Sequence, residues 1–99
     1  MPPANARWHL CTPPDRPGAI AIVQVSGDVN AAFGALGMPP LPAGGMGVRD
    51  LAGIDRGLVA RHGDDVLLLM PHGGTEVVRQ LSEALVRAGL CRADAALSP

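Results

Sequence analysis

The chain has 99 residues and a formal net charge of −1, and 47% of its residues are hydrophobic but only 2% aromatic. This length fits a single domain over residues 1–99 with one aliphatic core. The scarcity of aromatic side chains and the scattered arginines argue against a direct nucleic-acid surface, whether of the stacking or of the basic-stripe kind. No apolar run approaches the roughly 18 residues of a membrane-spanning helix, so no membrane contact is expected.

The N-terminal part of the sequence predicts two strands and a short helix. Residues 7–12 form a short strand, and the proline-rich stretch 13–18 forms a turn. Residues 19–27, AIAIVQVSG, are apolar and β-branched and have glycine at both ends, which is typical of a central strand. Asp28 stands at the N-cap position of a helix over residues 29–36.

A loop rich in glycine and proline, over residues 37–47, separates this helix from three further strands. Residues 48–53 and 54–63 are expected to form two strands, with a turn where they meet. Residues 64–71, DDVLLLMP, read as an apolar strand that is buried on both of its faces.

The spacing of apolar residues predicts a second helix over about residues 75–88, and Gly89 is placed to end it as the C′ residue. On another face of this helix, Arg79, Glu83 and Arg87 lie four residues apart, which predicts two i,i+4 ion pairs. The apolar face consists of Val77, Val78, Leu81, Ala84, Leu85 and Ala88.

A short strand over residues 90–94 completes the order β-β-α-β-β-β-α-β. This order predicts an α+β fold, a small single domain with a mixed or antiparallel sheet and two helices. No internal repeat is visible in the sequence.

The two cysteines, Cys11 and Cys91, stand alone without C-x-x-C spacing, so no zinc site is indicated. The first residues lack an apolar leader, which favours a cytoplasmic protein with both thiols reduced. We expect the cysteines to act as small hydrophobic residues. All eight basic residues are arginine, and this composition, also rich in Ala, Gly and Pro, is typical of a GC-rich bacterial genome.

The His-Gly-Gly turn at residues 72–74 precedes the second helix and has three interpretations. Paired glycines before a helix can present backbone N–H groups to an anion. The same letters occur in the oxyanion loop of lipases, but that chemistry needs a G-x-S-x-G elbow, which is absent around Ser26, Ser82 and Ser98. The third interpretation, a tight reversal from strand to helix, is favoured by roughly three to one.

No motif predicts a metal or nucleotide site. Asp64 and Asp65 are neighbours, and neighbouring residues of a strand point to opposite faces, so a solvated turn is favoured over a metal pair. The three histidines, at positions 9, 62 and 72, show no metal-ligand spacing. A Walker A sequence is also absent.

Two blocks of the sequence resemble one protein family. TPPDRPGAIAIVQVSG, residues 12–27, is similar to the opening of the TrmE (MnmE) tRNA-modification GTPases, T-P-P-G-R-G-G-I-x-I-x-R-x-S-G. GDDVLLLMPHGGTEVVRQLSEALVRAGLCRAD, residues 63–94, resembles that family's second block, in which G-E-D-x-x-E-x-x-x-H-G-G precedes a helix. The blocks occur in the family's order and cover about half of the chain, so the chain resembles the N-terminal domain of that family.

The resemblance implies an α+β domain related to the folate-binding domains of one-carbon enzymes. In the family this domain dimerises and binds 5-formyltetrahydrofolate near the dimer interface. A helical domain and a GTPase domain follow it, and together with a partner flavoprotein the whole enzyme modifies the wobble uridine of certain tRNAs. These two domains have no counterpart in this sequence, so no GTPase or other catalytic activity is expected of the chain by itself.

At the family's folate positions, the sequence departs from the pattern. The arginine of R-x-S-G is Gln24 here, and the glutamate of the second block is Leu68. The family's S-Y-T loop and its P-G-E-F segment are also missing, and a folate-contacting lysine beyond that segment has no counterpart. Three polar folate contacts are therefore substituted or absent. A lost contact to a charged group costs ~1.5–3 kcal/mol, and micromolar binding amounts to only about 8 kcal/mol.

We therefore expect a non-catalytic dimerisation or interaction module with an eroded folate site at Gln24 and Leu68. Its expected partner is a second copy of the chain or a TrmE-like protein, without a cofactor, a metal or direct contact to nucleic acid. The alternative is a 5-formyltetrahydrofolate-binding module of a one-carbon or tRNA-modification system.

Overall fold

The computed structural model describes residues 6–11 and 18–93, and their order of helices and strands confirms the predicted α+β class. The predicted turn at 13–18 therefore lies almost entirely outside the described residues. The elements are β1 (Ala6–Leu10), β2 (Gly18–Ile20), β3 (Val23–Gly27), α1 (Val29–Leu36), β4 (Met46–Leu51), β5 (Asp55–His62), β6 (Val66–Met70), β7 (His72–Gly73), α2 (Thr75–Arg87) and β8 (Cys91–Arg92).

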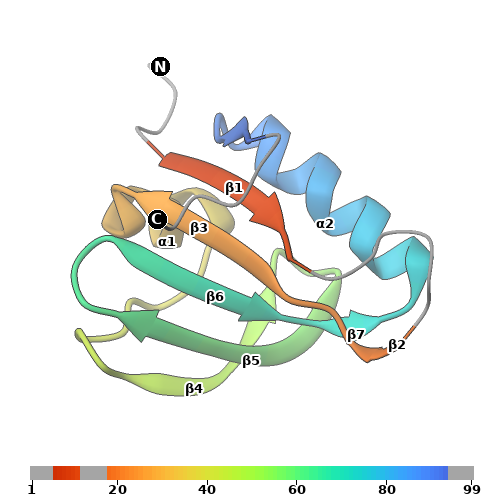
Figure 1. The fold of residues 1–99 in the computed structure, drawn as a ribbon, viewed down its shortest axis with the longest axis horizontal. Coiled ribbons are helices and arrows are strands. Elements are labelled where there is room, and N and C mark those ends of the chain that lie inside the picture. Colours follow the sequence, from red (N-terminus) through yellow and green to blue (C-terminus); the bar gives the residue numbers. More distant parts are fainter. Residues whose placement is uncertain (1–5, 12–17, 94–99) are drawn as a thin grey trace.

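Six of these strands form one mixed sheet in the order β4-β5-β6-β3-β1-β8, and β2 pairs with β7 in a small second sheet. Neighbouring strands of the large sheet are antiparallel, except that β8 runs parallel to β1. In Figure 1, α1 lies behind the sheet and α2 lies beside β1, and Phe33 of α1 and Leu85 of α2 belong to the same core cluster, so both helices cover one face of the sheet. Within the described residues, no helix lies on the other face.

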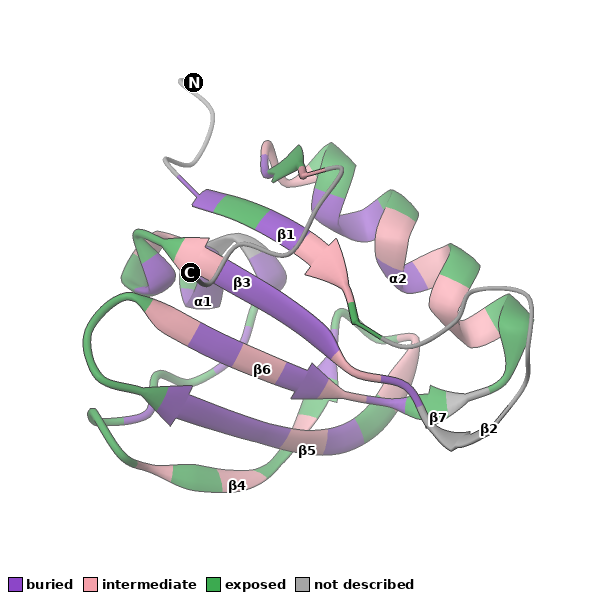
Figure 2. Ribbon diagram, viewed as in Figure 1, coloured by how far each residue is buried: buried purple, intermediate pink, exposed green. Residues whose placement is uncertain are grey.

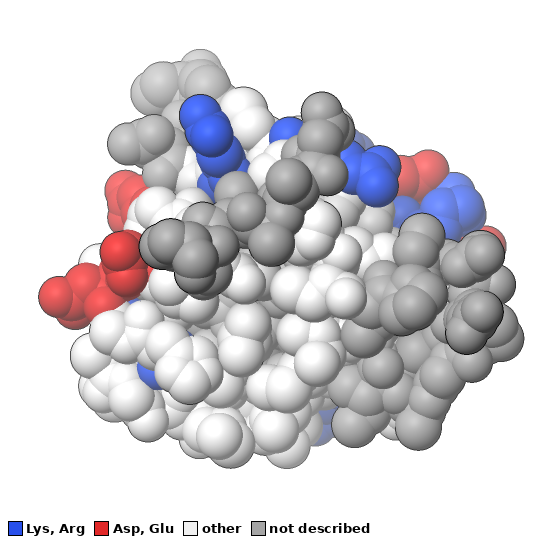
Figure 3. Space-filling model, viewed as in Figure 1, with Lys and Arg blue, Asp and Glu red and all other residues white. Residues whose placement is uncertain are grey.

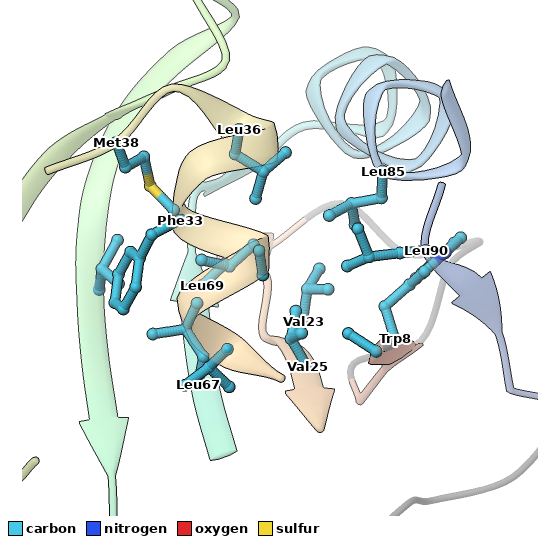
Figure 4. Packing of buried hydrophobic residues seen from close by; sticks show 14 of the residues in the cluster. Trp8, Val23, Val25, Phe33, Leu36, Met38, Leu67, Leu69, Leu85 and Leu90 are labelled. Atoms are coloured by element: carbon cyan, nitrogen blue, oxygen red, sulfur yellow. The ribbon is translucent and has the colours of Figure 1, made fainter. Parts of the chain in front are cut away.

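The hydrophobic core lies between the helices and the covered face of the sheet (Figure 4). Aliphatic side chains make up most of it, as the composition predicts, and the single Trp and the single Phe are both buried within it. Its members include Trp8, Val23, Val25, Phe33, Leu36, Met38, Leu41, Leu51, Leu67, Leu69, Leu81, Leu85 and Leu90.

The prediction that residues 64–71 are buried on both faces is wrong. Along β6 the exposure alternates, which Figure 2 shows as alternating colours. Leu67 and Leu69 are 0% exposed and point towards the helices, whereas Leu68 is only partly buried on the opposite face. The reason is that antiparallel neighbours bring no crossover helix to the second face.

The single strand predicted over residues 19–27 is instead two strands with different partners. At the break, the backbone N–H of Ala21 donates to the carbonyl of Pro71 at 3.0 Å, and the N–H of Cys11 donates to the carbonyl of Ile22 at 2.8 Å. β2 thus pairs with β7 and β3 pairs with β1 and β6. Pro71 has no N–H, so it cannot continue the β6 ladder, and β7 begins directly after it.

Both helices begin and end at the residues that their sequences predict. Asp28 caps α1 by accepting a hydrogen bond from the Ala31 N–H at 3.1 Å. α2 ends in a Schellman motif, in which Gly89, at φ 93°, donates to Val86 and the following Leu90 donates to Leu85.

Of the two ion pairs predicted on α2, the structure contains one. Arg79 binds Glu83 at 2.8 Å, but among the described residues Glu83 forms no ion pair with Arg87. Arg79 instead forms its second ion pair with Glu76, one turn towards the N-terminus. The Arg79 guanidinium thus pairs with two carboxylates, and Arg87 is exposed at the end of the helix.

The expectation that the cysteines act as buried hydrophobic residues is wrong. Cys11 and Cys91 are both free thiols, and both are exposed. Cys11 follows the last residue of β1, and Cys91 lies on the two-residue edge strand β8, so neither position faces the core.

A buried arginine fixes the long loop between α1 and β4. Arg61 is 8% exposed and points to the covered face from the end of β5. Its guanidinium donates to the carbonyls of Leu41 at 2.9 Å and Gly63 at 3.0 Å, and to Asn30 Oδ1 at 3.1 Å. One side chain therefore ties together the loop, α1 and the β5–β6 turn, a role for which the planar fork of arginine is suited.

Candidate functional site on the open face of the sheet

The structure brings the two predicted folate positions together. Gln24 on β3 lies directly opposite Leu68 on β6, and directly opposite residues of antiparallel strands point to the same face. The row continues through His9 on one side and through Ala60 and Met46 on the other. All five lie on the face opposite to the two helices, which we call the open face, although Gln24 and Ala60 are themselves buried there and Met46 is exposed.

At the centre of this row, the polar group is a buried amide without charge. Gln24 is 8% exposed, and its Nε2 donates to Ser26 Oγ at 3.4 Å. Leu68 beside it offers no hydrogen-bonding atom. The pair can therefore contribute one amide to a ligand but cannot form the charge-assisted contacts of an arginine and a glutamate.

Around Leu68, the open face is apolar over three strands. Two rows cross β4, β5 and β6, and we call these six residues the open-face patch: Met46, Ala60 and Leu68 in one row, Val48, Leu58 and Met70 in the other. Met46 and Val48 are 65% and 51% exposed, which places them among the most exposed large hydrophobic residues of the described chain. Figure 3, which views this face, shows no Lys, Arg, Asp or Glu over the middle of β5 and β6.

The His-Gly-Gly turn joins a strand to a helix, as the favoured interpretation predicts. His72 and Gly73 form β7, and Gly74 is the N-cap of α2. The His72 backbone N–H donates to Asp55 Oδ2 at 2.8 Å, and its ring Nδ1 lies 3.0 Å from the same oxygen. The backbone hydrogen bond holds the pKa of Asp55 below its ordinary value of 3.8. The first N–H group of the turn is therefore already occupied by Asp55.

The other chemistry-bearing residues of the sequence do not converge. Asp64 and Asp65 are exposed in the turn between β5 and β6. His9 lies on β1 and His62 on β5, and two other strands, β6 and β3, lie between them in the sheet. Within residues 6–11 and 18–93, no group of three or more His, Cys, Asp or Glu side chains is arranged to hold a metal ion.

An open pocket of about 520 Å³, which no sequence motif indicates, lies between α2, β1 and β8. Its lining residues come from β1, α2 and β8, and they are Trp8, Ser82, Glu83, Val86, Arg87 and Arg92. The indole Nε1 of Trp8 is buried and has no hydrogen-bond partner among the described residues. A buried donor without a partner costs roughly 1–3 kcal/mol. A single Trp in an otherwise aliphatic sequence was the one available signal.

In comparisons with known proteins, no protein-family model and no curated protein matches this chain. None of the helices in the described ranges is long and apolar enough to span a membrane.

Proposed function

We propose that this chain is a non-catalytic interaction domain that pairs with a second copy of itself through the open-face patch. The pathway that we propose for this pairing is tRNA wobble-uridine modification in the bacterial cytoplasm, and its support is the resemblance of residues 12–27 and 63–94 to the TrmE family. The observation that carries the proposal is the exposure of Met46 and Val48 on an apolar sheet face opposite to α1 and α2.

A second copy is the occupant that the charge distribution favours. In a two-fold contact the same patch meets itself, so any charge in its centre would face a like charge. The centre of the open-face patch carries none, and the whole chain has a formal net charge of only −1, so self-association meets little repulsion. Charged residues lie at the rim instead, where Asp50 on β4 is paired in register with Arg56 on β5.

The test is a matched pair of lysine substitutions. Val48 lies in the open-face patch and is 51% exposed, whereas Val86 on α2 is 56% exposed and lies outside it. In the proposed dimer, Val48→Lys buries two like charges against each other and should raise the dimer dissociation constant about tenfold or more. Val86→Lys should leave this constant unchanged, as measured by sedimentation equilibrium over a range of protein concentrations.

The proposal fails if the wild-type chain stays monomeric at the highest protein concentrations, or if both lysine variants weaken the dimer equally. If the chain binds a full-length TrmE-like protein but does not bind itself, the open-face patch remains the proposed interface, and the partner in the proposal is wrong.

One observation favours a second candidate function, the binding of 5-formyltetrahydrofolate. Gln24 and Leu68, which align with the family's folate positions, are direct neighbours on the open face. Titration calorimetry with this compound separates the two functions. Micromolar binding at one ligand per chain, lost in Gln24→Ala, would support a folate site. No heat at millimolar ligand would support the interaction domain.

The variant Gln24→Arg sharpens that test. The new guanidinium would lie beside Leu68, which cannot accept a hydrogen bond, so it should not restore tight folate binding. A submicromolar affinity of Gln24→Arg for 5-formyltetrahydrofolate would contradict the view that the site is eroded.

A further inference from the structure

We propose that the pocket between α2, β1 and β8 binds a small monocarboxylate with an apolar body. This site lies apart from the open face and does not depend on the proposed pairing. Its volume of about 520 Å³ falls in the range of about 300–1,000 Å³ that is typical of small-molecule sites.

Two guanidinium groups supply the charge for an anion. Arg87 and Arg92 both line the pocket and are both exposed, and among the described residues neither has a carboxylate partner. Arginine presents a planar fork of N–H donors that matches the two oxygens of a carboxylate. Within the described residues, the pocket therefore holds two guanidinium forks that no carboxylate occupies.

The floor of the pocket adds a third donor. Trp8 is 1% exposed, and its indole Nε1 is buried and unpaired within the described part of the chain. Figure 4 shows the ring edge-on, reaching from β1 beneath Leu90. The guanidinium of Arg92 lies over the ring, 5.2 Å from its centroid. Arg92 is exposed and lines the same pocket as the indole, so one anion can lie close to both.

The remaining lining residues select the class of anion. Val86 is 56% exposed and offers an apolar wall to the body of a ligand. Glu83 also lines the pocket, and although Arg79 binds it at 2.8 Å, its carboxylate disfavours a dianion more than a monoanion. A single carboxylate on an apolar body matches the two guanidinium groups and the Val86 wall and meets less repulsion from Glu83 than inorganic phosphate, which also has no apolar body.

Trp8 also supplies the readout. It is the single Trp of a chain without Tyr, so fluorescence excited in the indole band reports on this pocket alone. The probe is hexanoate, titrated at constant ionic strength. 1-Hexanol serves as the same chain without the charge, and inorganic phosphate as charge without the chain. We expect saturable binding of hexanoate on the order of millimolar, and binding of the two comparison compounds about tenfold weaker or more.

Three variants locate the site. Arg92→Gln and Arg87→Gln should each weaken hexanoate binding about tenfold or more, because each removes a charge-assisted contact. Arg56→Gln, an exposed arginine on β5, is the control and should bind as the wild type does. Arg92→Gln changes the surroundings of the indole, so the dissociation constant and not the signal amplitude is compared. The indole N–H resonance of Trp8 gives a second readout by NMR, and it should move downfield on binding.

The inference is overturned if hexanoate at tens of millimolar changes neither the fluorescence nor the indole resonance. Equal binding of 1-hexanol would show an apolar cleft without carboxylate recognition, and equal binding of phosphate would show simple charge attraction. Either result also contradicts the proposal. Unchanged hexanoate affinity in both Arg87→Gln and Arg92→Gln would place the bound probe elsewhere.

Discussion

The two faces of the six-stranded sheet are built from the same strands but have different surroundings. On β6, Leu67 and Leu69 are 0% exposed beneath the helices, while Leu68 between them points to the open face and is only partly buried. Three identical neighbours therefore have two roles. Burial beneath the helices stabilises the fold of a single chain, whereas an apolar residue on an uncovered face leaves part of its hydrophobic free energy to be gained on association.

The largest expected effect on stability is a difference between alanine substitutions at the adjacent positions 67 and 68. Leu67→Ala should lower the free energy of unfolding by about 3–5 kcal/mol, because it removes a buried side chain and leaves a cavity in a closed core. Leu68→Ala should cost only about 1–2 kcal/mol, since no closed cavity forms on the open face. Urea unfolding at low micromolar protein concentration measures both. Equal losses would show that the open face is covered as tightly as the other one.

The next largest effect on stability is expected at Gly57, where backbone atoms of another segment come close. Gly57 on β5 is buried, and a Cβ at this position would lie 2.5 Å from the carbonyl oxygen of Met70 and 3.0 Å from Cα of Pro71. The main chain leaving β6 thus crosses where a side chain would stand. Gly57→Ala should destabilise the protein by about 1–3 kcal/mol, because backbone must shift.

Gly34 gives the matched control for the same substitution. It lies within α1, and a Cβ there would meet no atom within 4 Å. Gly34→Ala should therefore stabilise the protein by up to about 1 kcal/mol through helix propensity. Thermal unfolding of the two variants should show shifts of opposite sign, and a loss of stability in both would mean that the space around α1 is smaller than the structure shows.

A smaller effect appears where β5 meets β7, at the end of the sheet. The Asp55 carboxylate accepts the backbone N–H of His72, and this bond keeps the pKa of Asp55 below 3.8. A carboxyl whose pKa is lowered on folding adds stability above its unfolded pKa, and this stability is lost as the pH falls through the folded pKa. The wild type should therefore lose stability below about pH 4, and part of this loss should be absent in Asp55→Asn. Unfolding measured between pH 7 and pH 3 tests this, and identical pH profiles would contradict it.

Much of this fold could be predicted from local sequence, because its signals are local. Asp28 and Gly89 mark helix ends by their own backbone chemistry, and the positions of α1 and α2 follow from the spacing of apolar residues. The burial of β6 could not be predicted, since LLLM has no alternation, and which face is covered depends on helices that are distant in sequence. The role of Arg61 was hidden for the same reason, because its acceptors at Asn30 and Leu41 lie 31 and 20 residues away.

The candidate sites also differ in how far the local sequence predicts them. Sequence resemblance singled out Gln24 and Leu68, but only strand register shows that they are neighbours, within an apolar surface that extends to Met46. No sequence motif predicted the pocket at Trp8. One wall is α2, and the others come from the two ends of the described chain, β1 and β8, which pair in parallel.

The smallest expected effect on stability concerns the outer, solvent-facing side of α2. The inner face of this helix buries Leu81 and Leu85, whereas its outer face carries Glu76, Arg79 and Glu83, whose side chains are exposed. Hydrogen bonds from Arg79, and then from Gln80, lower the pKa of Glu76 from 4.5 to about 2. Water and salt screen such an exposed network, so it should change the titration of Glu76 far more than the stability of the fold.

Replacing the shared arginine tests this view of the outer face. Arg79→Met should raise the pKa of Glu76 most of the way back towards 4.5, as followed by NMR of the side-chain carboxyl, and high salt should do the same to a lesser degree in the wild type. Arg87→Met, on the same helix but without an ion pair among the described residues, should leave the pKa of Glu76 unchanged. A Glu76 that titrates near 4.5 in the wild type would show that water separates these side chains in solution. The inner face would then hold α2 in place without help from the outer one, because Leu81 and Leu85 do not depend on the charge of Glu76.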